Sequence, residues 1–191
     1  DLQEILGFDI DGGIQAMDYS ALTTSLAGGK LDIGAAALCA TDERKEVMNF
    51  TDTYCDSGQV VMINTENTDD ISGVDDLSGK KVAVEKGTAS HMYATKNLAD
   101  SEIEVHDTIT TAYESLEQEK VNAVLQDGPG AAFYIKTTAD TKLEVIGEEF
   151  NQGQAPYAIA VSKDCKYLEQ INTALNMLQK DGTLDELYAK W

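Results

Sequence analysis

The chain lacks any apolar run near the ~20 residues that a helix needs to span a bilayer. Groups that bind metals are also few. The three cysteines (Cys39, Cys55 and Cys165) form no CxxC motif, and the two histidines (His91 and His106) lie far apart in the sequence. There is no glycine-rich phosphate-binding loop. We therefore expect no metal ion, no organic cofactor and no membrane-spanning helix.

Positive charge is scarce as well. The chain has 14 lysine and arginine residues against 34 aspartate and glutamate residues, a formal net charge of -20. Nucleic acids and anionic membrane surfaces would repel such a chain, so we exclude both as partners. Arg44 is the only arginine, which singles it out as a candidate functional residue. The 191 residues suffice for one domain or for two small lobes.

Strand-like apolar runs alternate with helix-like segments. Helices are expected at 20–30, 41–48, 89–98, 109–119, 130–136, 168–180 and 184–191. Strands are expected at 31–37, 59–64, 82–85, 102–105, 121–126, 143–146 and 158–161. Ser20 and Thr41 are the expected N-caps of the first two helices. This alternation favours an α/β fold with a parallel sheet covered by helices on both faces.

Three segments each place polar residues after a strand-like run: 36–44, 82–90 and 123–129. Together they supply Arg44, a turn at Thr88 and Asp127. A pocket for a free amino acid needs a guanidinium or a helix N-terminus for the carboxylate, and a carboxylate for the ammonium group. The three segments have that set, and each follows the carboxyl end of an expected strand, where ligands bind in open α/β sheets.

Nine sequence segments, taken in order, resemble the extracellular solute-binding proteins of polar amino-acid ABC importers. Glutamine-type and basic-amino-acid-type members of this group, family 3, are the most similar in wording. The segments are GFDID at 7–11, MDYSAL at 17–22, GKLDI at 29–33, TDERKEVMNFTDTY at 41–54, DSGQVVMI at 56–63, DLSGKKVAVEKGT at 76–88, AVLQD at 123–127, APYAIAVSK at 155–163 and DGTLDELYAKW at 181–191.

The resemblance implies the two-lobe type II periplasmic-binding-protein fold. Each lobe would be a mainly parallel sheet flanked by helices, and two crossing strands would join the lobes. We expect residues 1–60 and 155–191 to form lobe 1, and residues 61–154 to form lobe 2. Such lobes close on their ligand like a hinged jaw.

The resemblance also implies how the backbone of an amino acid would be bound. Arg44 would grip the α-carboxylate, and Asp127 would receive the α-ammonium group. The turn at Thr88 and Ala89 would offer backbone N–H groups to the carboxylate. Ala37 would offer its carbonyl oxygen. The alternatives are a surface helix arginine at position 44, a solvated turn carboxylate at position 127 and a plain N-cap at position 88.

Further positions would contact the ligand or its side chain. Tyr19 would stack on that side chain, the alternative being a buried core tyrosine. Cys39 stands where the family usually has threonine or serine, and a thiol is a weak hydrogen-bonding group. Glu85 and Gln126 would recognise the side chain of the ligand. An acid at position 85 hints at a cationic or amide ligand.

The N-terminal region departs from the family pattern. Only residues 1–6 represent its first strand and loop, and no helix follows GFDID. Instead, Asp11-Gly12-Gly13 has the composition of a tight hairpin turn. The chain is thus either a remodelled variant or incomplete near its N-terminus. We expect the latter.

We accordingly expect a monomeric, extracytoplasmic, non-enzymatic protein that delivers a polar amino acid to an ABC permease. A signal peptide and a lipid anchor would belong to that type of protein. One alternative is the ligand-sensing ectodomain of a receptor. Another is a same-fold enzyme such as a cyclohexadienyl dehydratase, for which Glu85 is the only pocket carboxylate without another role.

Overall fold

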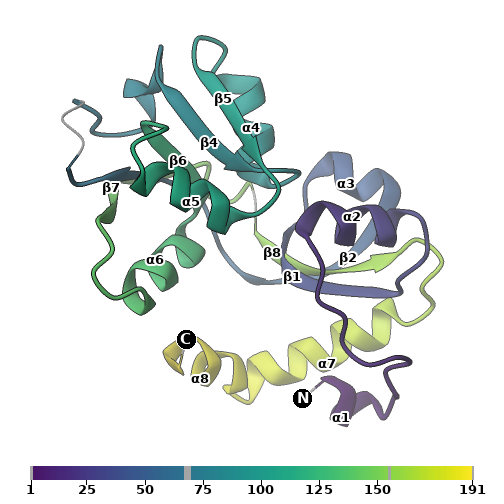
Figure 1. Ribbon diagram of the computed structural model, residues 1–191. Helices are drawn as coiled ribbons and strands as arrows, with labels where there is room; N and C mark the ends of the chain where they lie inside the picture. Colours follow the sequence, from purple (N-terminus) through teal and green to yellow (C-terminus); the bar gives the residue numbers. More distant parts are fainter. Residues whose placement is uncertain (1, 67–69, 155, 191) are drawn as a thin grey trace. The chain divides into compact units, whose positions relative to one another are not determined.

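A computed structural model describes residues 2–66, 70–154 and 156–190 (Figure 1). The chain forms two compact units. Unit 1 comprises Asp1–Asp56 and Pro156–Trp191, and unit 2 comprises Ser57–Ala155. The functional lobe boundaries expected from the sequence, 1–60 with 155–191 and 61–154, stay a prediction. Each unit has its own sheet and its own hydrophobic cores, one on either face of that sheet.

Unit 1 is built on a three-stranded sheet with the order β1-β8-β2. The strands are β1 (Ile33–Cys39), β2 (Met48–Cys55) and β8 (Tyr157–Ser162). Both pairings are antiparallel. The helices are α1 (Leu2–Leu6), α2 (Tyr19–Ala27), α3 (Asp42–Val47), α7 (Leu168–Lys180) and α8 (Thr183–Lys190). The central strand β8 is buried along its whole length.

Successive side chains of β8 point to opposite faces of the sheet and pack into two different cores. Ala160 packs with Leu26 of α2 on one face, and Ile159 and Val161 pack with Ile171 of α7 on the other. The two helices therefore cover opposite faces of the sheet (Figure 1). Burial on both faces explains why β8 reads as a continuous apolar run in the sequence.

Polar side chains of α7 form hydrogen bonds with backbone groups of β2, which is an edge strand. Asn172 Oδ1 accepts the N–H of Asp52 at 2.7 Å, and Gln179 Nε2 donates to the carbonyl of Thr53 at 3.4 Å. Asn176 Nδ2 lies 3.2 Å from the Asp52 carboxylate. These contacts cover backbone groups that could otherwise pair with another chain.

Unit 2 is built on a five-stranded sheet with the order β5-β4-β6-β3-β7. The strands are β3 (Gln59–Asn64), β4 (Lys81–Glu85), β5 (Glu102–His106), β6 (Ala123–Asp127) and β7 (Leu143–Phe150). The helices are η1 (Val74–Leu77), α4 (Ala89–Asn97), α5 (Ile109–Glu117) and α6 (Gly128–Thr137). One core joins the sheet to α5 and α6, and a second joins its other face to α4.

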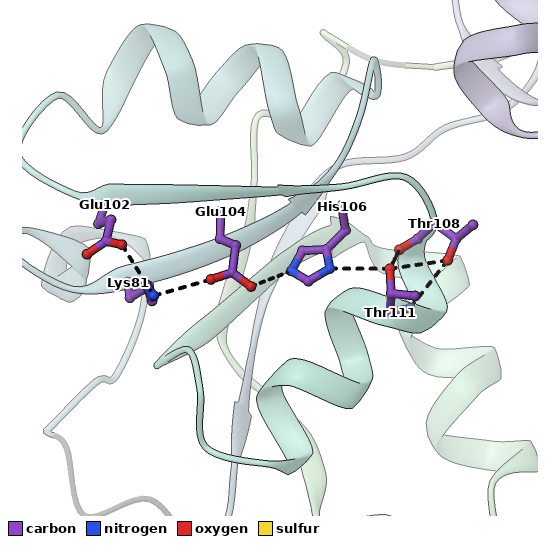
Figure 2. A network of polar contacts seen from close by, with 6 residues as sticks. All are labelled: Lys81, Glu102, Glu104, His106, Thr108 and Thr111. Carbon is purple, nitrogen blue, oxygen red and sulfur yellow. Dashed lines mark hydrogen bonds and ion pairs between the residues drawn. The ribbon is translucent and has the colours of Figure 1, made fainter.

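A chain of charged and polar contacts ties β4, β5 and the start of α5 together (Figure 2). Lys81 Nζ lies 3.2 Å from Glu102 and 3.3 Å from Glu104. His106 Nε2 lies 2.9 Å from the other oxygen of Glu104, and its Nδ1 lies 3.2 Å from the Thr111 hydroxyl. Glu102, Glu104 and His106 alternate along β5 and therefore share one face of the sheet.

Strand directions correct one expectation. The sheet of unit 1 is wholly antiparallel, and in unit 2 only β5, β4 and β6 run parallel, while β3 and β7 pair antiparallel. The prediction of a mainly parallel sheet is therefore wrong for unit 1. The reason is that β8 comes from the far end of the chain and runs between β1 and β2 in the opposite direction.

Local predictions also needed correction near the N-terminus. The helix expected at 20–30 runs from Tyr19 to Ala27, and its N-cap is Asp18, two residues before the expected Ser20. Strand β2 and helix α1 were not predicted. Gly12 lies in a turn in which the Gly13 N–H bonds the Ile10 carbonyl at 3.1 Å, but no strands flank it, so the hairpin expected there is wrong.

Helix lengths bear on membrane crossing. The longest helix within 2–66, 70–154 and 156–190 is α7, with 13 residues, and none of the helices described there is long and apolar enough to cross a bilayer.

Candidate functional site

The end of β1 and the start of α3 place Arg44 in unit 1. Thr41 caps α3 by accepting the N–H of Arg44 at 3.4 Å, which sets the residue in the first turn of the helix. Its guanidinium reaches back to β1, where Nη1 donates to the Cys39 carbonyl at 2.8 Å. The side chain is 7% exposed, so the alternative of a surface arginine is wrong.

The Arg44 guanidinium also lies over an aromatic ring. Its carbon is 5.2 Å from the ring centroid of Tyr19, within the range of a cation–π contact. Tyr19 is the first residue of α2 and packs in part against the core around Leu26. Unit 1 therefore brings together Tyr19, Cys39 and Arg44.

Ala37 interrupts β1. Its φ is +51°, a left-handed conformation that costs a non-glycine residue about 1–2 kcal/mol. The β1–β8 register shifts between Gly34 and Leu38, so the strand bulges there. Burial raises the pKa of Tyr54 to about 12, and a hydrogen bond with the Ala37 backbone opposes that rise. The Tyr54 side chain therefore contacts the backbone at the bulge.

Cys39 is almost fully buried, and its thiol and carbonyl both contact protein groups. The thiol lies 3.9 Å from the Ala37 carbonyl oxygen, and the Cys39 carbonyl accepts from Arg44. The contribution of Cys39 is therefore to orient Arg44 through its backbone, and a contact between its thiol and a ligand stays a prediction.

In unit 2 the turn after β4 leads into α4. The Thr88 hydroxyl donates to the Glu85 carbonyl at 2.8 Å and accepts the His91 N–H at 3.2 Å, so its single proton is used within the turn. The first N–H groups of α4, including that of Ala89, have no partner within the helix by geometry. They can bind an anion as the resemblance implies, through the backbone.

His91 is a residue of this turn that the sequence analysis missed. Its Nδ1 accepts the N–H of Gly87 at 3.0 Å. Gly87 has a φ of +78°, which glycine adopts without strain. In a capping box, the side chain three residues after the N-cap accepts a hydrogen bond from the backbone before the helix. The spacing from Thr88 to His91 fits this motif, so it could have indicated the role of His91 in the sequence.

Asp127 ends β6 and occupies the N-cap position of α6. Although aspartate is a preferred N-cap residue, its side chain makes no capping hydrogen bond. The carboxylate instead lies 3.5 Å from the amide nitrogen of Gln59. The carboxylate therefore contacts β3 and does not cap its own helix.

Glu85 and Gln126 lie at the ends of neighbouring parallel strands, since Ala83 of β4 pairs with Val124 of β6. Burial raises the pKa of Tyr113, the nearby carboxylates of Asp127 and Glu85 raise it further, and a hydrogen bond from the Gln126 side chain opposes the rise. Gln126 therefore hydrogen-bonds Tyr113, and the carboxylates of Asp127 and Glu85 lie near enough to raise its pKa. The sequence analysis did not single out Tyr113.

The model of the bacterial extracellular solute-binding proteins, family 3, matches residues 2–191. The chain belongs to this family. This solute-binding protein is 30% identical to the L-cystine-binding protein TcyJ of Escherichia coli over 182 residues, which is 95% of the chain and 68% of the relative. It is 27% identical to the ABC transporter glutamine-binding protein GlnH of Bacillus subtilis over 205 residues, 98% of the chain and 73% of the relative.

Solved structures confirm the fold class of this solute-binding protein as the type II periplasmic-binding-protein fold. An ancestral arginine-binding protein bound to glutamine has a TM-score of 0.90 and 34% identity, covering 100% of this chain and 83% of that one. The arginine-, lysine-, histidine-binding protein ArtJ from Geobacillus stearothermophilus has a TM-score of 0.91 and 26% identity, with 100% and 81% covered.

Proposed function

We propose that this solute-binding protein acts outside the cytoplasm, binds a polar amino acid and delivers it to a membrane ABC permease without changing it chemically. The observation that carries the proposal is Arg44. The only arginine of the chain is nearly buried, and it is oriented by the Cys39 carbonyl and the Tyr19 ring. Relatives in the family bind cystine, glutamine and arginine, according to their names.

The proposed roles follow the chemistry of each group. Arg44 binds the α-carboxylate with its planar fork, and the Ala89 N–H at the start of α4 adds a backbone donor. Asp127 binds the α-ammonium group, helped by the Ala37 carbonyl. Tyr19 covers the ligand side chain. Thr88 acts as the cap that holds the turn, since its hydroxyl proton is bonded to the Glu85 carbonyl.

Glu85 and Gln126 point to a ligand side chain that donates hydrogen bonds. A carboxylate accepts only, and the Gln126 amide already contacts Tyr113. A guanidinium, an ammonium or an amide would suit this pair. Arginine, glutamine and cystine, which relatives bind, all carry such N–H groups.

Two other functions have some support. The GluR0 ligand-binding core from Nostoc punctiforme in complex with L-glutamate has a TM-score of 0.88 and 28% identity, which favours a sensing role as the second candidate. An ancestral amino acid-binding protein described as a precursor of cyclohexadienyl dehydratase has a TM-score of 0.85 and 30% identity. That likeness keeps an enzymatic role as the third.

A thermal-shift screen of the twenty amino acids and L-cystine tests the binding. A ligand that binds only the folded state stabilises it by about 2.7 kcal/mol at a hundred times its Kd. We expect polar amino acids with N–H groups in their side chains to raise the melting temperature. A screen in which none of the amino acids raises it would contradict the proposal.

Two further measurements separate the candidate functions. Mass spectrometry after long incubation should recover the bound amino acid unchanged, whereas an altered product would favour the enzyme. In proteoliposomes that contain the permease, the liganded protein should stimulate ATP hydrolysis. Binding without stimulation would favour the sensor. Analytical ultracentrifugation with and without ligand should give a monomer.

A further inference from the structure

An amide side chain is buried at one end of β3. All six residues of this strand are buried, and Gln59 has an exposed fraction of 0%. A buried amide without hydrogen bonds is destabilising, so such a side chain normally has partners at both ends. Gln59 has them: Oε1 accepts from Asn151 Nδ2 at 2.6 Å, and Nε2 donates to Asp127 Oδ1 at 3.5 Å.

Strand pairing places these three residues together. Gln59 lies opposite Asp127 of β6 and opposite Phe150 of β7, because β3 runs between those strands. Side chains directly opposite in an antiparallel pair point to the same face. Asn151 follows β7 with a φ of +56°, a left-handed conformation that asparagine tolerates better than most residues.

The backbone around Gln59 is held as well. The Gly58 N–H donates to Glu149 Oε1 at 2.6 Å, and the Gly58 carbonyl accepts the Gly128 N–H at 3.0 Å. A Cβ at Gly58 would lie 2.6 Å from the Phe150 carbonyl oxygen, so only glycine fits. Gln59 therefore extends from a fixed backbone, and the rotation of its amide is limited by Asn151.

The Asp127 carboxylate has two competing directions. As the N-cap residue of α6 it could turn to the helix, where Pro129 has no N–H and the N–H of Gly130 is the accessible partner. The structure has no such capping bond, and the carboxylate faces Gln59 instead. The Gln59 amide is a hydrogen-bond donor that favours this second direction.

We propose that Gln59, fixed by Asn151, is a positioning residue that keeps the Asp127 carboxylate directed at the ligand's α-ammonium group. The inference rests on the proposed function, which gives Asp127 that role. Without the Gln59 amide, the carboxylate populates two orientations, one toward the ligand and one toward the N-terminus of α6. Affinity then falls for ligands with an α-ammonium group, and much less for analogues without one.

Two variants remove the contact in different ways. Gln59→Met keeps the length of the side chain and removes the amide, while Asn151→Gly removes the partner and tolerates the positive φ. Gln152→Ala is the matched control. Its amide lies one residue after Asn151 and contacts Glu149 at 3.1 Å rather than Gln59. If Gln59→Met fails to fold, Asn151→Gly still tests the inference.

The readout is the ratio of affinities within matched pairs, measured by competition calorimetry. The pairs are L-arginine with 5-guanidinopentanoate and L-glutamine with glutaramate, each differing only in the α-ammonium group. Because the Gln59 amide acts on the ligand through a single hydrogen bond to Asp127, we expect the ratio to fall about 3- to 10-fold in Gln59→Met and Asn151→Gly. Gln152→Ala should leave it unchanged.

Other outcomes overturn the inference in distinguishable ways. Equal losses for both members of a pair would assign Gln59 a purely structural role, and an unchanged ratio would deny it any role. In an Asp127→Asn background, Gln59→Met should have no further effect on the ratio, and a further fall would contradict action through Asp127. If the wild-type protein bound none of the four compounds, the proposed ligand class would fail, and this inference with it.

Discussion

Replacing Arg44 by methionine should weaken amino-acid binding by at least an order of magnitude while unit 1 stays folded. The fold loses a charge-assisted hydrogen bond at 2.8 Å and a cation–π contact at 5.2 Å. These are worth about 1.5–3 and 0.5–1 kcal/mol, but the variant also avoids burying a guanidinium, which offsets part of the loss. We expect a net destabilisation of about 1–3 kcal/mol, within the stability of an ordinary domain.

The effect on binding should be larger. Removing one partner of a buried charge pair costs about 2–5 kcal/mol, which is roughly 30-fold to several thousand-fold in affinity. Arg44→Lys keeps the charge but loses the planar fork, so its affinity should lie between those of the wild type and Arg44→Met. Isothermal calorimetry with the ligand from the thermal-shift screen gives the affinities, and circular dichroism checks the fold.

Lys45 provides the control for charge alone. It is the next residue of α3, and its exposed ammonium group pairs with Asp42 at 3.1 Å. Lys45→Met removes the same net charge and should change the affinity little, because exposed ion pairs contribute about 0–1 kcal/mol. A folded Arg44→Met variant that binds within threefold of the wild type would refute the assignment of Arg44.

Three further predictions concern the folded state. Ala37→Val should destabilise the protein by about 1–2 kcal/mol in urea unfolding, because a β-branched residue is strained at a φ of +51°, whereas Ala36→Val, at an exposed position of the same strand, should not. Burial alone would raise the pKa of Glu104, but Lys81 and His106 together outweigh it, so this pKa lies below its ordinary 4.5. A carboxylate with a lowered folded pKa stabilises the protein above its unfolded pKa and loses this effect as the pH falls through the folded value, so Glu104→Gln should lower the melting temperature at pH 7 but hardly at pH 2. Equal effects at both pH values would contradict this. Asn172→Leu should expose the Asp52 N–H on the edge of β2 and increase light scattering on warming, while Thr173→Leu, one position further on α7, should not.

Much of unit 2 was predictable because its signals are local. Its strands are short apolar runs between turn residues, and Thr88 caps its helix, as the sequence pattern allowed. In contrast, the direction of pairing in unit 1 depends on where β8 inserts, which no local pattern encodes. Strand β2 was missed because its two register shifts break the regular alternation that marks a strand.

The residues of the candidate site also differ in whether a local sequence pattern indicates them. Arg44 and Asp127 stand out in the sequence because each follows an apolar run, and one of them is the only arginine. Gln59 lies 68 residues from Asp127 and 92 from Asn151, so their contacts follow from strand order alone. The polar residues that support a site are therefore harder to predict than those that face a ligand.

The order of strands in unit 1 also determines when that unit can fold during synthesis. β1 and β2 do not pair with each other, since both pair with β8. Their shared partner is Tyr157–Ser162, which the ribosome makes only after every residue of unit 2. Unit 2 is a continuous segment and can fold before β8, the shared partner of β1 and β2, has been synthesised. A nascent chain that stops before β8 therefore keeps two strands with exposed edges, and chaperones would have to shield them until translation is complete.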